Sequence, residues 1–209
     1  MMIIDMHIHT NISSRCSSIT PEELIKRSRE LGLDAVCVTE HSTPRGAQVN
    51  YEYARRRGFK VFRGMEVFTE LGDMLVFGWE ENIRYYLFPF KELKKEVEKR
   101  KGIIIPAHPC RGDADVRHSY NRDFPEELLT AIVAIETKNG SLSRKSNEKA
   151  EELAVRYSLF GTGGSDAHHE SHIGKCVTVF EDEPSNEREL IEALKSGRYR
   201  AVYFEELSS

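Results

Sequence analysis

The sequence has little of several features that would place it in a special class. It has four cysteines in 209 residues, and none of them forms a Cys-x-x-Cys pair. No apolar run approaches the roughly 18 residues that a membrane-spanning helix needs. The first residues carry neither a basic lead-in nor the apolar segment of a secretory signal. We therefore expect a cytoplasmic protein with reduced thiols and no membrane partner.

Positive charge is also in short supply. Lys and Arg together number 30 against 34 Asp and Glu, which gives a formal net charge of −4. Such a balance provides no general surface for polyanions, although it allows a local basic patch. Nucleic acid is therefore expected at most as a short substrate. The hydrophobic fraction of 39% suits a soluble globular protein, and the length predicts a single domain, 1–209. The sequence does not indicate an oligomeric state.

Strand-like and helix-like segments alternate along the chain, which indicates an α/β protein. The expected strands are 2–10, 35–41, 60–68, 73–78, 103–109, 131–135, 159–162, 177–180 and 199–204. The expected helices are 21–31, 47–57, 90–101, 147–157 and 186–195. Thr20 and Glu23 predict a capping box at the first helix, and Gly72 predicts a turn that pairs two neighbouring strands. The longest irregular stretch, 110–125, has the length of a functional loop.

The first strand places two histidines on one side. Side chains alternate along a strand, so one face is apolar and the other carries Ile3, Asp5, His7 and His9. Neutral imidazole is a common metal ligand, and the Asp5 carboxylate behind the histidines could accept a second ring N–H. The alternative is a surface strand that merely contains two histidines.

Further candidate ligands follow, each at a predicted strand end. They are His41, Glu66, His108, Asp166 and His168. In β/α barrels the reactive residues lie where strands end and loops begin. One such histidine is commonly an ordinary hydrogen-bonded polar group, but the repetition favours a shared metal site. Mixed histidine and carboxylate ligands suit Zn, Mn or Fe better than Mg or Ca.

These residues occur in motifs that resemble those of the PHP family, the metal-dependent phosphoesterases named for polymerase and histidinol phosphatase members. The motifs are His7-Ile8-His9-Thr10, Thr39-Glu40-His41, Gly64-Met65-Glu66, Ala107-His108-Pro109 and Gly164-Ser165-Asp166-Ala167-His168. The resemblance implies a distorted seven-stranded, TIM-like barrel of parallel-type strands with helices outside. It also implies two or three divalent metal ions at the strand ends.

The resemblance also implies how the ligands are shared. His7, His9, Glu66 and Asp166 would hold the first metal. Glu66 would bridge to a second metal, which His108 also binds, whereas His41 and His168 would belong to a third.

The chain departs from the family pattern in two places. Family members usually have an Asp or His where this chain has Ser13, Ser14 and Arg15, and many have a histidine on the strand that here spans 73–78. The second and third metals thus each lose an expected ligand. Water, phosphate or Glu40 could fill these places, or one site could be weak or empty.

Other residues are candidates for substrate contacts. Arg111 follows His108 closely, and its guanidinium fork matches phosphate oxygens, but an ordinary loop arginine is an equal alternative. His118 is our candidate for the proton donor, motivated only by its place in the 110–125 loop. Glu136 and Asn139 follow the predicted 131–135 strand, where they could line the pocket or begin a helix.

The residues together predict hydrolysis of a small phosphate ester, a phosphomonoester or a nucleotide, by metal-activated water. One alternative is a metal-dependent amide or deacetylation hydrolase, since similar ligand sets support it. A second alternative is a non-catalytic, nucleic-acid-associated subunit of the same fold. The acidic charge and the complete first-metal ligand set both disfavour this second alternative.

Overall fold

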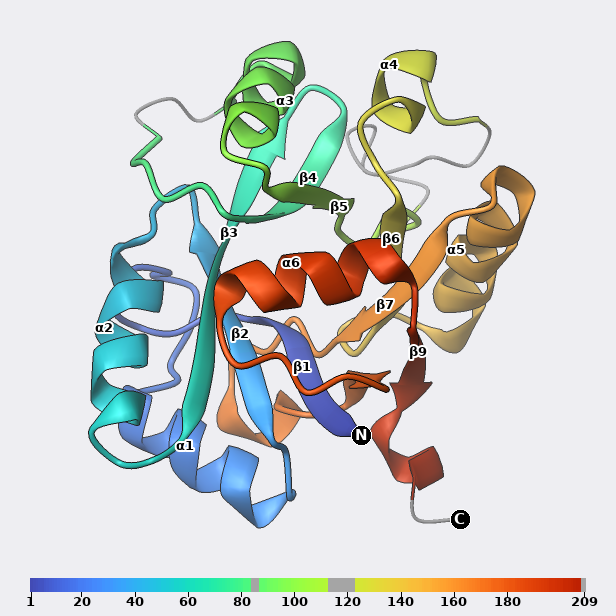
Figure 1. The fold of residues 1–209 in the computed structure, drawn as a ribbon. Helices are drawn as coiled ribbons and strands as arrows, with labels where there is room; N and C mark the ends of the chain where they lie inside the picture. Colours follow the sequence, from blue (N-terminus) through green and yellow to red (C-terminus); the bar gives the residue numbers. More distant parts are fainter. Residues whose placement is uncertain (84–86, 113–122, 208–209) are drawn as a thin grey trace.

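A curled sheet forms the centre of the molecule (Figure 1). The structure, a computed structural model, describes residues 1–83, 87–112 and 123–207. Within these residues the main sheet has seven strands in the order β5-β4-β3-β2-β1-β8-β9, and β6 and β7 form a separate pair. The strands are β1 (Met2–Ile8), β2 (Ala35–His41), β3 (Lys60–Thr69), β4 (Gly72–Phe77), β5 (Ile103–Pro106), β6 (Ala134–Asn139), β7 (Phe160–Gly164), β8 (Cys176–Phe180) and β9 (Tyr199–Tyr203). The helices are α1 (Pro21–Glu30), α2 (Arg45–Arg55), α3 (Phe90–Lys99), α4 (Glu126–Leu129), α5 (Arg144–Tyr157) and α6 (Glu187–Ser196), with short 3₁₀ turns η1 (Glu170–His172) and η2 (Phe204–Leu207).

The α/β class and a curled seven-stranded sheet are confirmed, whereas the expectation that the strands are of parallel type is wrong. Only β1–β2, β2–β3 and β6–β7 pair in parallel among the described strands. The strands β4, β5, β8 and β9 pair antiparallel to their neighbours. Two residues connect β3 to β4, and so short a connection permits only an antiparallel pair. The result is a curled half-barrel. An isolated bridge between Ile8 and Ala167 also connects β1 to the segment just after β7.

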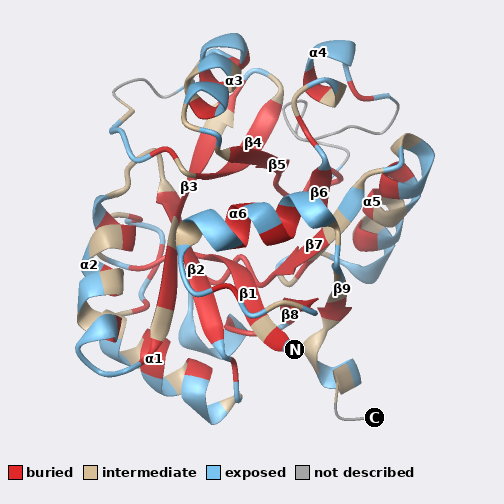
Figure 2. Cartoon of the chain, viewed as in Figure 1, coloured by how far each residue is buried: buried red, intermediate tan, exposed pale blue. Residues whose placement is uncertain are grey.

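The strands of the sheet are mostly buried (Figure 2), and apolar clusters pack on both of its faces. Inside the curl, α6 packs its residues Leu190, Ile191 and Leu194 against the inner faces of β1 to β5. Burial of each such side chain contributes roughly 1.5–3 kcal/mol. Outside the curl, α1 and α2 cover β1 to β3, whereas α3 and α5 cover β3 to β6. Because α6 fills one end of the curl, the other end is the side where polar groups gather.

Local signals place most element boundaries correctly. The predicted capping box of α1 is present, with Thr20 and Glu23 bonding each other's backbone N–H, and the predicted hairpin turn ends at Gly72. The predicted 131–135 strand is wrong in position. Its first residues instead follow the short helix α4, where the Ala131 N–H donates to the Leu128 carbonyl. Strand β6 therefore starts later, and Glu136 lies within it.

Candidate metal centre

A bulge in β1 decides which way its histidines point. Asp5 pairs with Val36, whereas Ile8 pairs with Val38, so β1 uses one residue more than β2 over the same length. Such a bulge turns the following side chains to the opposite face. Ile8 accordingly packs with Val36 and Val38 in the apolar cluster under α1 and α2, outside the curl. The two histidines that flank Ile8 therefore point inward, and the prediction that Asp5 shares their face is wrong.

His7 and His9 converge on two carboxylates. Both imidazoles are fully buried, and their Nε2 atoms lie 3.0 Å apart. The Nε2 atom of His7 lies 3.5 Å from Glu66 Oε1 and 3.6 Å from Asp166 Oδ1. The Nε2 atom of His9 lies 3.4 Å from Glu66 Oε2 and 3.5 Å from Asp166 Oδ1. Ring nitrogens and carboxylate oxygens thus surround one small space.

Glu66 is central to the cluster. It lies beside His41 in the β2–β3 register, and its Oε2 atom lies 2.9 Å from His41 Nδ1. Its Oε1 atom lies 3.0 Å from His108 Nε2, just beyond the end of β5. His168 follows β7, where its ring stacks on that of His9 with a centroid distance of 4.4 Å.

The structure thus brings all seven predicted ligands together. They form three sets in which the candidate ligand atoms lie within 4.8 Å of one another: His7, His9 and Asp166; His7, Glu66 and His108; and His9, His41 and His168. His7 and His9 are each shared by two sets. His7, His9, His41, His108, Asp166 and His168 lie at or just after strand ends, as the sequence predicts, whereas Glu66 lies within β3.

A carboxylate of another strand, Glu136, orients two of the candidate ligands. Its Oε1 atom lies 3.0 Å from His7 Nδ1, and its Oε2 atom accepts the backbone N–H of His108 at 2.7 Å. Asn139 donates to the same Oε2 atom at 2.9 Å. The expectation that Asp5 binds a ring N–H is therefore wrong. Asp5 instead accepts backbone N–H groups, including that of Ser165 at 2.8 Å.

Ser14 and Glu40 form a second support behind His9. The Ser14 hydroxyl lies 3.3 Å from His9 Nδ1 and donates to the Glu40 carboxylate. Glu40 also accepts the N–H and the hydroxyl of Thr10. Glu40 thus has partners that hold it behind the histidine, and it does not occur in any of the three ligand sets.

Two candidate ligands have backbone angles that are unusual for residues other than glycine. The φ angles of His108 and Asp166 are +32° and +52°. Non-glycine residues in this region cost of order 1–3 kcal/mol and cluster at functional sites. The Asp166 N–H donates to the His7 carbonyl at 2.8 Å, so backbone contacts between the ligand loops hold this conformation.

The electrostatics of the cluster favour cation binding. Burial disfavours the charged form of His7, but the carboxylates of Glu136, Asp166 and Glu66 outweigh this effect and raise its pKa well above the ordinary value. Burial lowers the pKa of His9 to about 3. Burial acts to raise the pKa values of Glu66 and Asp166, yet the charge of His7 holds both well below the usual range. Metal ions bind anionic carboxylates and neutral imidazoles, so a cation would displace the proton that these carboxylates stabilise on His7.

Arg111 lies at the edge of the cluster. Its Nη2 atom donates to Asp166 Oδ2 at 2.9 Å, its Nη1 atom lies 3.3 Å from His108 Nε2, and its side chain is 39% exposed. The Ser141 hydroxyl donates to the same Asp166 oxygen at 2.8 Å. The structure thus places Arg111 beside the candidate ligands, whereas the other predicted catalytic residue, His118, lies outside the described residues. Cys110 is buried in the apolar cluster that α3 and α5 form with the sheet.

The donor set fits divalent cations. Five histidines and two carboxylates meet in one space. Glu66 directs one oxygen to His41 and the other to His108, so this carboxylate can serve two neighbouring ions. Sequence reasoning left the role of Glu136 open, because no pattern tells a pocket carboxylate from the start of a helix.

Curated sequences and a family model match parts of the chain. The model described as PHP-associated matches residues 144–199. An uncharacterized protein of Methanocaldococcus jannaschii is 27% identical over 117 residues, which is 52% of this chain and 68% of that protein. A PolC-type DNA polymerase III of Caldanaerobacter subterraneus is 35% identical over 63 residues, which is 30% of this chain and only 4% of the polymerase.

Solved structures share the fold at low sequence identity. A two-domain protein of Bacteroides vulgatus, described as containing a PHP-like metal-dependent phosphoesterase, aligns with a TM-score of 0.77 at 20% identity, over 97% of this chain and 64% of that one. A sulfate-bound, metal-free amidohydrolase of Chromobacterium violaceum aligns with a TM-score of 0.68 at 17% identity, over 99% of both chains. A lesion-specific endonuclease of Pyrococcus furiosus gives a TM-score of 0.64 at 17% identity, over 96% of this chain and 58% of that one.

The PHP resemblance read from the motifs is confirmed by the match to the PHP-associated model and by the shared fold. The helices of the described residues are all too short or too polar to cross a bilayer.

Proposed function

From its PHP character we propose that this chain is a metal-dependent hydrolase of small phosphate esters, a phosphomonoester or a nucleotide. The observation that carries the proposal is the shared donor cluster with a guanidinium at its edge. Glu66 directs one oxygen to His41 and the other to His108, and Arg111 lies 2.9 Å from the Asp166 carboxylate. Adjacent cations and an arginine together match the charge of a phosphate group.

When bound, two or more Zn, Mn or Fe ions would supply a nucleophilic water at neutral pH and a clamp for phosphate oxygens. His7, His9, Glu66 and Asp166 would hold one ion, and Glu66 and His108 would hold a second. His41 and His168 would hold a third.

The protein's own groups would then orient the ester. Arg111 can turn from Asp166 towards a phosphate oxygen, because its side chain is partly exposed. A charge-assisted hydrogen bond there contributes about 1.5–3 kcal/mol. Glu136 keeps the Nδ1 side of His7 occupied, so that its Nε2 atom faces the centre. His118 stays our prediction for the group that protonates the leaving oxygen.

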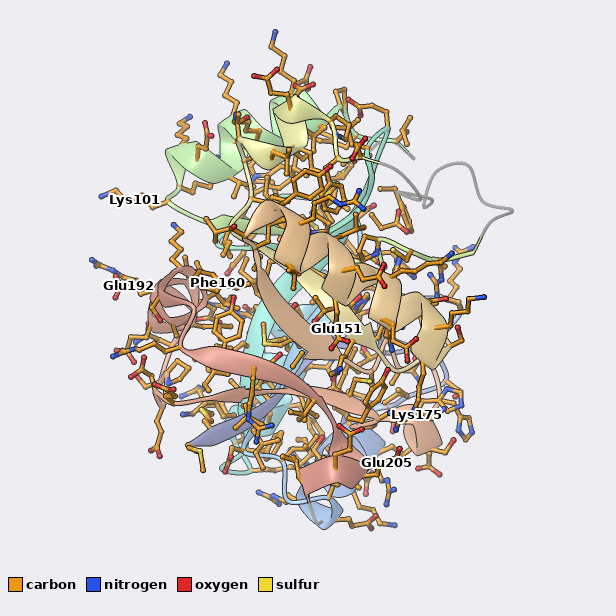
Figure 3. All side chains as sticks on the ribbon, turned by 90° about the vertical axis from the view of Figure 1, so that its right-hand side faces the viewer. Lys101, Glu151, Phe160, Lys175, Glu192 and Glu205 are labelled. Atoms are coloured by element: carbon orange, nitrogen blue, oxygen red, sulfur yellow. The ribbon has the colours of Figure 1, made fainter. Side chains whose placement is uncertain are left out.

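Two other functions have some support. The amidohydrolase neighbour favours amide hydrolysis at the same site, and the endonuclease and polymerase relatives favour nucleic acid. Charge argues against a long nucleic acid, because acidic residues outnumber basic ones, 34 to 30, and the side seen in Figure 3 carries both lysines and glutamates. The residues labelled there are Lys101, Glu151, Phe160, Lys175, Glu192 and Glu205. A polyanion would need a more uniformly basic face.

Three chromogenic substrates separate these functions. We expect the Zn- or Mn-loaded protein to hydrolyse p-nitrophenyl phosphate faster than bis-p-nitrophenyl phosphate, and p-nitroacetanilide not at all. Replacement Arg111→Met should lower kcat/KM for the monoester by about 10- to 150-fold, the loss of one charge-assisted bond. Replacement Arg144→Met, at an exposed arginine that pairs with Glu205, is the control. Cleavage of the anilide without cleavage of either phosphate ester would contradict the proposal.

A further inference from the structure

The space around His108 contains another carboxylate, Asp73, which does not occur in the three donor sets. Asp73 lies at the start of β4, and its side chain is only 6% exposed. Its Oδ2 atom lies 3.9 Å from His108 Nε2. His108 Nε2 in turn lies 3.0 Å from Glu66 Oε1. A buried carboxylate therefore lies next to a histidine and a glutamate that are both candidate ligands.

The strand register explains why the Asp73 side chain points to this space. In the antiparallel β3–β4 pair, Glu66 lies opposite Leu75 and Phe68 lies opposite Asp73. Leu75 belongs to the inner apolar cluster, and alternate residues of a strand share a face. Asp73 therefore faces the inside of the curl, two residues nearer the end of the hairpin than Leu75. At this level the ring of Phe68 stacks on His41 with a centroid distance of 5.1 Å.

Strand β5 holds Asp73 from the other side, since β4 lies between β3 and β5 (Figure 1). The Asp73 carbonyl accepts the Ala107 N–H at 2.9 Å. Ala107 directly precedes His108 in the chain. The backbone thus fixes Asp73 between the strand that supplies Glu66 and the segment that supplies His108.

The distance fits two ligands of one ion. Metal bonds to carboxylate oxygen and histidine nitrogen are about 2.1 Å long. Two such ligands lie roughly 3.0 Å apart at a right angle and at most about 4.2 Å apart when they are opposite. The 3.9 Å between Asp73 Oδ2 and His108 Nε2 falls within this range.

We propose that Asp73 is a ligand of the cation that Glu66 and His108 hold. The inference rests on the metal centre of the proposed function and adds a residue to it. The sequence suggests that the second metal lacks a ligand on the strand that is now β4. In this assignment the Asp73 carboxylate supplies that ligand. Two carboxylates and one histidine form a harder ligand set than the histidines His41 and His168 of the third ion. Hard oxygen ligands favour Mn²⁺, whereas imidazoles suit Zn²⁺.

Mn²⁺ binding to the metal-free full chain tests this assignment, measured by isothermal titration calorimetry and by electron paramagnetic resonance. Replacement Asp73→Asn should remove one tightly bound Mn²⁺ or weaken it at least tenfold. Replacement Asp182→Asn is the matched control. Asp182 is an exposed carboxylate that pairs with Arg198 and belongs to none of the donor sets. It should bind Mn²⁺ like the wild type. Unchanged stoichiometry and affinities in Asp73→Asn would overturn the assignment.

Replacement Asp73→His keeps a ligand and changes its chemistry. It should retain the ion and shift the preference from Mn²⁺ towards Zn²⁺ by at least tenfold. If Asp73→Asn does not fold, the Asp73→His protein tests the assignment instead. An unchanged preference between Mn²⁺ and Zn²⁺ in this variant would overturn it. Turnover is not part of either readout. A protein that binds metal as described but cleaves no phosphate ester would therefore contradict the proposed function and leave Asp73 as a ligand.

Discussion

Glu136 should matter to metal binding although it occurs in none of the ligand sets. Its two oxygens accept from the backbone N–H of His108, from Asn139 and, with Nδ1 protonated, from His7. Replacement Glu136→Gln leaves one oxygen for these donors and turns an amide NH₂ towards the remaining one. A buried donor without an acceptor costs about 1–3 kcal/mol.

Loss of a hydrogen bond behind a metal-binding histidine commonly lowers metal affinity by about 10- to 100-fold, or roughly 1.4–2.7 kcal/mol. The two estimates agree, so we expect an affinity loss in this range for the ion that His7 binds. Competition with a chromogenic chelator measures it directly.

The control for this experiment is Glu151→Gln. Glu151 is a partly exposed carboxylate on α5 that pairs with Lys138, so its loss should change metal affinity less than twofold. A folded Glu136→Gln protein that binds Zn²⁺ or Mn²⁺ within twofold of the wild type would refute the reasoning.

Two further predictions concern buried ionisable groups. Burial raises the pKa of Asp5 from 3.8 to about 6, so the folded state holds a proton that the unfolded state releases, and stability falls as pH rises from about 4 to 6. Relative to the wild type, Asp5→Asn should gain up to roughly 3 kcal/mol over this interval in urea unfolding, and parallel pH profiles would contradict this. Burial also raises the pKa of Cys110 to about 11, and Cys37 and Cys176 are buried as well, whereas Cys16 is exposed. An aromatic disulfide reagent at pH 8 should therefore modify one thiol in the folded protein and four in denaturant, and rapid modification of two or more in the folded protein would show that the described packing is wrong.

The positions of the candidate ligands could be predicted from the sequence because strand ends and motifs are local features. His41 and Glu66 each follow an apolar strand pattern, and parallel neighbours bring such ends to one edge. The PHP resemblance supplied the order of the motifs. The α/β class and the capping box of α1 came from equally local patterns.

Other features depend on packing that no local pattern reports. The β1 bulge that turns His7 inward arises from the pairing of β1 with β2. The turn at Gly72 predicts that β3 and β4 pair, but it does not show which residues of the two strands lie opposite each other. Asp73 was missed for this reason, since its inward direction follows from the β3–β4 register.

The most direct test is metal content by elemental analysis together with phosphate release from a small phosphate ester, for the wild type and Asp166→Asn. The Asp166 carboxylate lies within 3.6 Å of both His7 and His9 Nε2 atoms. We predict two or more Zn or Mn ions per wild-type chain, and a variant that loses metal and at least about 100-fold in turnover. A wild-type protein that binds no metal when Zn and Mn are supplied, or a variant with full turnover, would contradict the account.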